Sequence, residues 1–152
     1  MNTPMSTCTQ IIYQIVFSTK RREQVMTKET RDELYGYIVG LLENKKCHPY
    51  RINGVEDHIH ILTHIHPSVA LSDLIKDIKI STSKYIKEKN LFVGFSSWQE
   101  GYGAFTYSMR EKDILINYIK NQEEHHRVKT FREEYIELLN EHEIEFEEKY
   151  FL

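Results

Sequence analysis

An alternation of imidazole and aliphatic side chains, His58-Ile59-His60-Ile61, constrains the fold of this 152-residue chain most strongly. Successive side chains of a β-strand point to opposite faces of the sheet, so His58 and His60 share one face and Ile59 and Ile61 the other. The pattern predicts a strand with a buried aliphatic side and two imidazoles side by side. Neutral imidazole is the commonest side-chain metal ligand, but a half-exposed strand with histidine on its polar face fits the pair equally well.

Two more histidines, His64 and His66, follow on the same strand face by parity. Pro67 comes next, and a proline ends ladder pairing because it lacks an N–H. The later pair is therefore predicted at a strand end near solvent. His58 and His60 are the preferred metal ligands, although four histidines could also form one binding surface.

Composition places the chain among ordinary globular proteins, with 40% hydrophobic and 28% charged residues. Its length suits one domain, residues 1–152. No apolar run approaches the roughly 20 residues of a membrane span, and the polar N-terminus lacks the apolar core of a signal peptide. Cys8 and Cys47 form neither a metal-binding spacing nor a disulfide framework. We expect a cytoplasmic protein without a membrane partner.

The net charge of −3 hides an asymmetry between the two ends of the chain. Residues 129–152 form an acidic, helical tail with eight Glu against three basic residues, whereas residues 1–128 carry +2. An acidic total argues only weakly against nucleic-acid binding, because a local basic face matters more than the sum.

Strand and helix patterns alternate along the core, which we place at about residues 8–108. We expect strands at residues 10–18, 50–55, 58–66 and 104–107, and helices at residues 28–45 and 71–86. This order is the ferredoxin-like pattern, an α+β fold with a four-stranded antiparallel sheet, two helices on one face and the other face open. Gly36 and Gly40 are expected to let the first helix pack closely on the sheet, and Ser68 to cap the second.

A further helix, at about residues 109–126, begins with a capping box in which Ser108 is the cap and Glu111 follows three residues later. Tyr118, Gln122 and His125 stand at i, i+4 and i+7, so they are expected on one stripe. A phenol and an amide at that spacing can face the same metal or phosphate.

Three other features fit nucleic-acid binding, but each also has an ordinary structural explanation. Basic residues cluster at 20–22, and a lysine stripe runs along the second helix at Lys76, Lys79 and Lys87. Both could follow a phosphate backbone, although solvated surfaces look the same. The loop at 91–103 carries Trp98 and Tyr102, whose rings could stack on bases or pack inside the protein.

Three motifs together closely resemble the single-tyrosine HUH transposases of bacterial insertion sequences, the IS200-like transposases. They are Asp57-His58-Ile59-His60, Gly101-Tyr102-Gly103-Ala104-Phe105, and the stretch from Tyr118 to His126. They occur in the order of that family and at about its separations. The resemblance runs from the first strand to about residue 150.

The resemblance implies a transposase that cleaves and rejoins single-stranded DNA at insertion-sequence ends through a 5′-phosphotyrosine. It makes Tyr118 the nucleophile, His58 and His60 the metal ligands, and Gln122 the third ligand. The metal would be Mg²⁺ or Mn²⁺, and no nucleotide cofactor is needed because the phosphotyrosine keeps the energy of the phosphodiester.

The resemblance also implies partners, a single-stranded DNA hairpin and a second copy of the chain. The strand at 104–107 is short, aromatic and poor in protective charge, which favours pairing across a sheet edge. In related dimers the tyrosine helix can serve the histidines of the partner, and we expect the same exchange here.

Two functions of other classes remain open from the residues. Ferredoxin-like sheets often bind single-stranded nucleic acid without chemistry, and covalent capture of DNA would separate that function from a transposase. A zinc hydrolase with Asp57 or Glu56 as base is disfavoured because the chain has no H-E-x-x-H helix.

Overall fold

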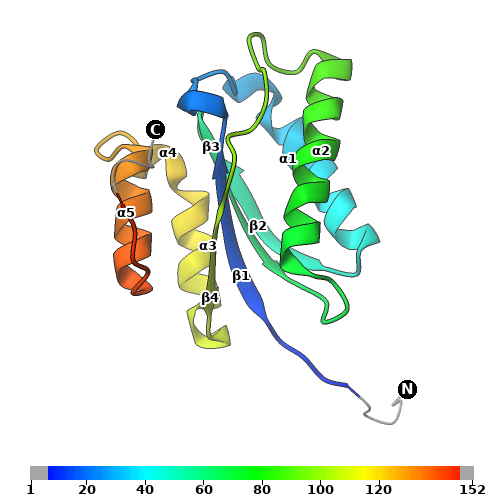
Figure 1. The fold of residues 1–152 in the computed structure, drawn as a ribbon, viewed down its shortest axis with the longest axis vertical. Helices are drawn as coiled ribbons and strands as arrows, with labels where there is room; N and C mark the ends of the chain where they lie inside the picture. Colours follow the sequence, from blue (N-terminus) through cyan, green and yellow to red (C-terminus); the bar gives the residue numbers. More distant parts are fainter. Residues whose placement is uncertain (1–6, 148–152) are drawn as a thin grey trace.

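Four antiparallel strands form one sheet, in the order β2-β3-β1-β4, in the computed structural model, which describes residues 7–147 (Figure 1). The two arms of the hairpin, β2 and the histidine-rich β3, pair with each other, and β3 also pairs with β1. This is the predicted ferredoxin-like arrangement. The strands are β1 (Ile12–Ser18), β2 (His48–Gly54), β3 (His58–His64) and β4 (Gly103–Tyr107).

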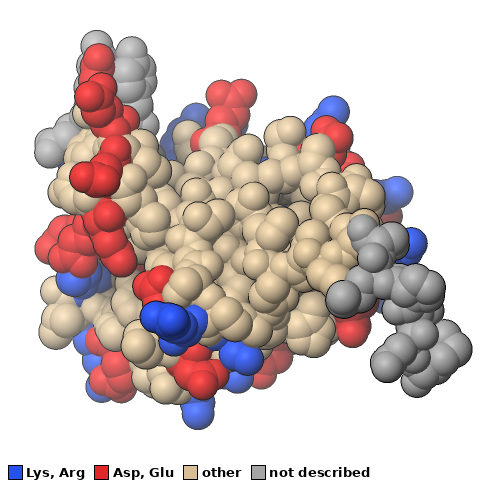
Figure 2. All heavy atoms as spheres, turned by 90° about the horizontal axis from the view of Figure 1, so that it is seen from below, with Lys and Arg blue, Asp and Glu red and all other residues tan. Residues whose placement is uncertain are grey.

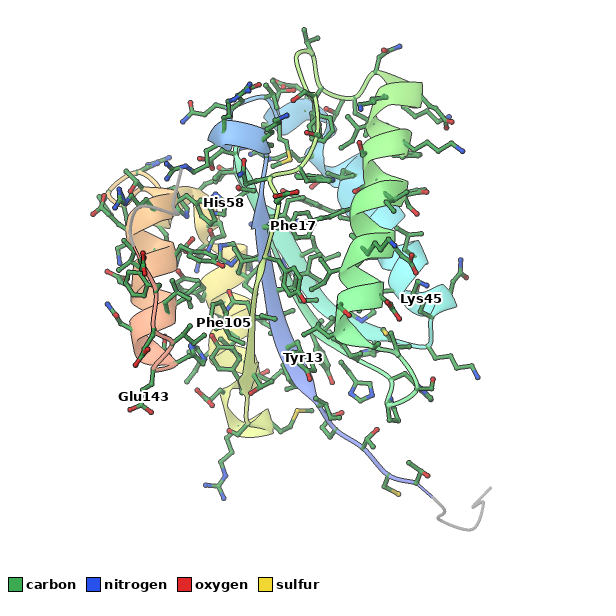
Figure 3. All side chains as sticks on the ribbon, viewed as in Figure 1. Tyr13, Phe17, Lys45, His58, Phe105 and Glu143 are labelled. Atoms are coloured by element: carbon green, nitrogen blue, oxygen red, sulfur yellow. The ribbon has the colours of Figure 1, made fainter. Side chains whose placement is uncertain are left out.

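Helices α1 (Lys28–Asn44) and α2 (Leu71–Lys89) cover one face of the sheet. Alternate side chains of β1 and β3 point to this face, as the period-two pattern requires. They pack against apolar residues of the two helices to form the main core (Figure 3, which labels Phe17 on this side). Its members include Ile15, Phe17, Ile59, Ile61, Leu34, Ile38, Leu74 and Ile78.

The opposite face, which we predicted to be open, is covered by α3 (Lys112–Lys120), α4 (Gln122–His125) and α5 (Phe131–Glu141). The reason is that this face is also apolar. Two smaller buried clusters join it to the helices: Ile12 and Leu62 with Leu115 and Ile119, and Val16 and Phe105 with Leu138 and Leu139. The sheet is therefore the middle of three layers, and the polar groups that face α3–α5 are enclosed.

The hairpin between β2 and β3 turns at Glu56 and Asp57, as predicted, and requires glycine at position 54. A Cβ atom on Gly54 would lie 2.3 Å from the carbonyl oxygen of His58. The backbone N–H of Val55 donates to that same oxygen at 3.2 Å. This close approach fixes the start of β3, and with it the first histidine.

Two local predictions were wrong. Gly36 and Gly40 lie on the exposed side of α1, where a Cβ would meet no atom within 4 Å, so they do not serve close packing. Ser68 does not cap α2: the cap position is Ala70, and the Ser68 hydroxyl instead lies 2.6 Å from the His66 ring. Of the two alternatives for the Trp98 ring, the structure shows packing: the ring is buried against Phe17 and its N–H donates to the Thr82 hydroxyl, so it offers no face for base stacking.

The tyrosine segment was predicted as one helix but consists of several short ones. The Ser108–Glu111 capping box is present and opens a 3₁₀ turn, Met109–Glu111, ahead of α3. Asn121 then interrupts the helix with φ −98° and ψ 25°, so α4 starts in a different register.

Charge is spread unevenly over the surface. In the view from below, acidic side chains gather at the left, on the side where Figure 1 places α5, and most of the middle of that face is uncharged (Figure 2). Across residues 7–147, no helix is both long and apolar enough to cross a membrane.

Candidate active site

Two interior-strand imidazoles form the floor of the candidate site. His58 and His60 are both fully buried on the face of β3 that meets α3–α5, with ring centroids 5.2 Å apart. Pairing with β1 aligns His58 with Ser18 and His60 with Val16. Since β3 is hydrogen-bonded on both sides, the sheet holds the two rings rigidly.

Hydrogen bonds on the far side of each ring aim the Nε2 atoms into the site. Asp57 Oδ1 lies 2.7 Å from His58 Nδ1, and Gln14 Oε1 lies 2.7 Å from His60 Nδ1. Such partners place the ring proton on Nδ1 and leave Nε2 free as a ligand. Gln14 is fixed in turn, because its amide N–H donates to the Tyr107 hydroxyl at 2.8 Å. Gln14 was not predicted from the sequence.

The structure brings Tyr118 and Gln122 to these histidines. The Tyr118 ring centroid is 6.1 Å from that of His60, and Gln122 Oε1 is 3.4 Å from His58 Nε2. The end of α3 is tied to the sheet, because the Asn53 amide donates to the carbonyls of Ile119 and Lys120 at 3.0 Å. In this single chain Tyr118 therefore meets the histidines of its own chain, and exchange between subunits stays a prediction.

The other predicted histidines lie elsewhere. His64 Nδ1 is 3.1 Å from the backbone nitrogen of Ile11, and His66 contacts Ser68, so both are engaged at the far end of β3. His125 stacks on the Tyr118 ring, at 4.5 Å between centroids, but does not face the histidine pair.

Glu134, which sequence reasoning missed, is the centre of the site. This α5 residue is 1% exposed. Its Oε1 lies 3.0 Å from His60 Nε2 and 3.3 Å from His58 Nε2. Its Oε2 accepts hydrogen bonds from the Tyr118 hydroxyl and from the Gln122 amide, the latter at 3.2 Å. One carboxylate thus joins the histidines to the tyrosine.

His126 is the second residue that sequence reasoning missed. Its Nε2 lies 3.0 Å from Glu134 Oε1, and its ring centroid is 4.4 Å from that of His58. The change of register at Asn121 turns His126 rather than His125 toward the site. Buried Arg31 holds α4 in place, because its guanidinium contacts Glu123 at 3.2 Å and donates to the carbonyl of Met26 at 2.8 Å.

Burial and hydrogen bonding shift the pKa values of these groups in opposite directions. Burial lowers the pKa of His60, whereas at His58 the hydrogen bonds to Asp57 and Glu134 outweigh burial and raise the pKa. Burial opposes ionisation of Glu134, but the three surrounding imidazoles hold its pKa well below the usual range. Burial, and then the Glu134 charge, raise the pKa of Tyr118. The site therefore holds an anionic carboxylate beside a neutral phenol.

The donor set fits a divalent metal ion. One ligand atom from each of His58, His60, His126 and Glu134 lies within 4.8 Å of the others. Imidazole nitrogen and carboxylate oxygen are both common ligands of divalent transition metals. Metal-bound histidines usually have a hydrogen-bond partner on the ring nitrogen that does not bind the metal, and Asp57 and Gln14 are such partners for His58 and His60.

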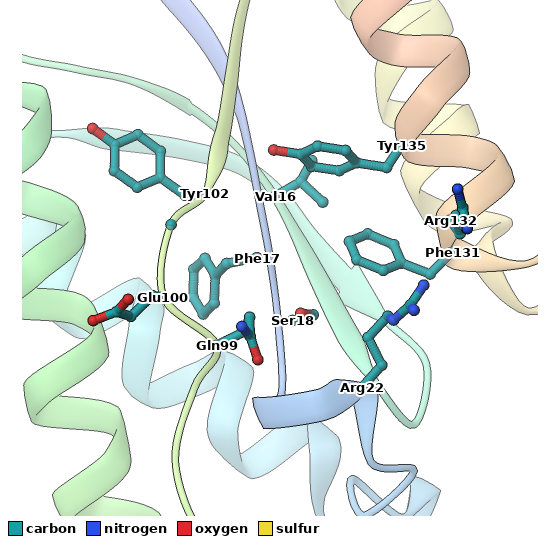
Figure 4. A pocket seen from close by; sticks show the side chains of 11 residues that line it. Val16, Phe17, Ser18, Arg22, Gln99, Glu100, Tyr102, Phe131, Arg132 and Tyr135 are labelled. Atoms are coloured by element: carbon teal, nitrogen blue, oxygen red, sulfur yellow. The ribbon is translucent and has the colours of Figure 1, made fainter. Parts of the chain in front are cut away.

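A cavity of about 230 Å³ adjoins this cluster, between β1, the loop at 99–102 and the start of α5 (Figure 4). Phe131 lines the cavity and also stacks on the His58 ring, with centroids 4.2 Å apart. Arg22, from the predicted basic cluster, lies at its edge. The cavity thus places a cation and aromatic rings next to the histidines.

The lysine stripe of α2 lines a broad groove of about 820 Å³ that also borders the loop at 97–102. Lys76, Lys84 and Lys87 contribute to it. Lys79 is already hydrogen-bonded within the protein, since its ammonium donates to the carbonyls of Gln99 and Gly101 at 2.8 and 2.5 Å. Tyr102 is 39% exposed at the same groove.

Comparison with known proteins shows which protein family this sequence matches. The sequence profile described as "Transposase IS200 like" matches residues 7–122. The ISDra2 transposase TnpA of Deinococcus radiodurans is 24% identical over 118 residues, 74% of this chain and 84% of that protein.

Two solved structures share the fold. One, from Deinococcus radiodurans R1 and described as a transposase, has a TM-score of 0.62 at 20% identity and covers 80% of this chain and 98% of that one. The other is the REP-associated tyrosine transposase bound to a REP hairpin, with a TM-score of 0.57 at 16% identity, covering 80% of this chain and 74% of that one.

Proposed function

The chain belongs to the IS200-like transposase family, and from this premise we propose that it cuts and rejoins single-stranded DNA at insertion-sequence ends. Tyr118 would form a covalent 5′-phosphotyrosine. His58 and His60, with Gln122 as third ligand, would hold a divalent metal ion, Mg²⁺ or Mn²⁺.

One observation carries this proposal: a tyrosine hydroxyl lies in the same buried cluster as two strand-borne imidazoles. Tyr118 and His60 both contact Glu134, so this one carboxylate connects the tyrosine hydroxyl to the imidazole. Tyr107, one of the nearby alternatives, has its hydroxyl bound by the Gln14 amide instead. A non-catalytic binding protein has no need for this arrangement.

The reaction follows from the chemistry of the groups. The Tyr118 oxygen would attack the phosphorus of a phosphodiester, an O–P bond would form, and the bond from phosphorus to the 3′ oxygen would break. The released strand takes up a proton and ends in a 3′-hydroxyl. A different 3′-hydroxyl can attack the phosphotyrosine in the reverse sense and rejoin strands. When bound, the metal ion would polarise a phosphate oxygen and offset its negative charge.

The contacts in the site support a positioning role for three further residues. Asp57 and Gln14 orient the two imidazoles, and Asn53 fixes the end of α3. Holding the nucleophile and the phosphate in one geometry is worth several orders of magnitude in rate.

Single-stranded DNA with a hairpin is the proposed substrate. The REP-associated relative was solved with a hairpin, and the α2 groove of this chain offers Lys76, Lys84 and Lys87 for phosphate contacts. Tyr102 provides an exposed ring at the same groove. We further propose a homodimer, because β4 lies at an edge of the sheet.

The test is to capture the covalent adduct. Purified protein is incubated with single-stranded oligonucleotides copied from the DNA that flanks its coding sequence, in the presence of Mg²⁺ or Mn²⁺. A denaturing gel should show a protein band retarded by attached DNA, absent when EDTA is present. Fully paired duplexes of the same sequence should give no such band. DNA binding without any adduct, on every flanking sequence, would favour the non-catalytic function.

A further inference from the structure

The function proposed above does not include Glu134 and His126 among the metal ligands, although both lie at the centre of the site. We propose that α4 and α5 complete the metal centre: His126 Nε2 and Glu134 Oε1 are ligands together with His58 and His60. Glu134 Oε2 then holds the Tyr118 hydroxyl beside the ion. This inference rests on the proposed metal-dependent function and names the composition of its site.

The distances around Glu134 Oε1 are those of neighbouring ligands on one ion. Ligands at about 2.0–2.2 Å from a divalent metal lie roughly 3.0–3.4 Å from one another in tetrahedral or octahedral geometry. The three Nε2 atoms of His60, His126 and His58 lie 3.0, 3.0 and 3.3 Å from Oε1. Glu134 is therefore already at ligand spacing from each imidazole.

The hydrogen bonding of His58 points to the same conclusion. Its ring faces a carboxylate oxygen on both sides, Asp57 Oδ1 at 2.7 Å and Glu134 Oε1 at 3.3 Å. A metal-bound imidazole uses one ring nitrogen as the ligand and has an outer partner on the other, and Asp57 beside Nδ1 leaves Nε2, which faces the Glu134 oxygen, as the ligand atom. A cation between these two atoms is stabilised by both.

The fold holds the two added ligands in place independently of the histidine strand. Glu134 lies on the same face of α5 as Leu138, one turn further on, which packs in the core. His126 follows α4, which the Arg31–Glu123 pair anchors. Both residues lie beyond residue 122, where the match to the family profile ends.

The donor set selects a class of metal. Three imidazole nitrogens and a carboxylate oxygen, with the Gln122 oxygen close by, favour divalent transition metals over Mg²⁺, which prefers oxygen ligands and retains its waters. We therefore expect Mn²⁺ to bind more tightly than Mg²⁺.

Calorimetric titration of the DNA-free, full-length protein with Mn²⁺ tests the inference. Wild type should bind one ion per chain. Glu134→Gln and His126→Ala should each weaken binding by at least the roughly 10–100-fold that loss of an outer partner costs. Two controls should bind as wild type does: Glu137→Gln, an exposed carboxylate on the same helix, and His64→Ala, an imidazole that contacts the backbone of Ile11 instead of the cluster. Unchanged or tighter binding by Glu134→Gln and His126→Ala would overturn the assignment.

A second measurement needs no variant, so it holds even if Glu134→Gln fails to fold. X-ray absorption at the manganese edge of the loaded wild-type protein should show three imidazoles around the ion, whereas two would contradict the inference. Both experiments omit DNA, so they are separate from the adduct assay. An adduct with only two imidazoles at the metal would reject the inference alone, and three imidazoles without any adduct would reject the proposed function alone.

Discussion

At the scale of single residues, the environment of each ring separates the two histidines that we propose as metal ligands from His64 and His66. His58 and His60 have their Nδ1 atoms bound by Asp57 and Gln14, and their Nε2 atoms face the same carboxylate oxygen. His64 is instead bound to the backbone of Ile11. The four histidines, predicted on one strand face, therefore divide into a buried pair on β3 and a pair with local structural contacts at and beyond the end of β3.

Replacing either member of the buried pair should stop DNA cleavage. His58→Ala or His60→Ala removes a proposed ligand, and we expect adduct formation to fall below detection while circular dichroism still shows the fold. His64→Ala and His66→Ala are the matched controls and should retain substantial activity. Comparable losses at all four positions would show that the site extends along the whole of β3.

The sequence was sufficient to identify four residues of the cluster but not its centre. His58 and His60 follow from strand parity, and Tyr118 and Gln122 from helical spacing and family resemblance. Glu134 stands in a run of eight glutamates with nothing in its composition to distinguish it. One signal was present: Glu134 shares a helical face with Leu138 and Phe131, and an acid on an apolar stripe needs a buried partner.

At the scale of elements, the hairpin between β2 and β3 and the break after α3 determine which side chains meet. The strands and the main helices were predicted within a few residues, because their hydrophobic periods are regular. The break at Asn121 was not predicted, since each residue from 109 to 126 is compatible with a helix. Tertiary contacts decide it: Asn53 binds the carbonyls of Ile119 and Lys120, so α3 ends there.

Gly54→Ala tests whether the hairpin positions the site. Its methyl group would overlap the His58 carbonyl oxygen, so the start of β3 must shift. We expect a loss of about 1–3 kcal/mol in the free energy of unfolding, the usual cost of overpacking, together with weaker Mn²⁺ binding.

Gly40→Ala is the control for that experiment. This helical glycine has open space around it and should stabilise the protein by about 0.5–1 kcal/mol, because alanine is the better helix former. Urea unfolding of the three proteins measures both values. Equal stability of Gly54→Ala and wild type would mean that the hairpin tolerates a side chain at this position.

At the scale of the whole molecule, the sheet is the middle of three layers, and the site lies inside the second interface. The helices after residue 112 close over the histidines, whereas the ferredoxin-like order of strands and helices alone suggested an open face. Because α3 is fixed to its own sheet by Asn53 and Tyr118 is bound by its own Glu134, each chain holds a complete set of site residues.

A mixing experiment tests this arrangement against exchange of tyrosines in a dimer. Tyr118→Phe and His60→Ala are each expected to be inactive, and the structure predicts that their mixture stays inactive. Exchange of subunits is verified with differently labelled copies, and light scattering gives the mass of the assembly. Recovery of cleavage in the mixture would show that α3 of one chain serves the histidines of the other.

The identity of the nucleophile is the central claim, and mapping the covalent bond tests it most directly. The adduct formed on single-stranded DNA is digested with nuclease and protease, and mass spectrometry locates the peptide that carries the remaining nucleotide. The nucleotide should be on Tyr118, and Tyr118→Phe, which removes one hydroxyl, should bind DNA but form no adduct. A nucleotide on Tyr107 or Tyr135, or an adduct that persists in Tyr118→Phe, would contradict the account.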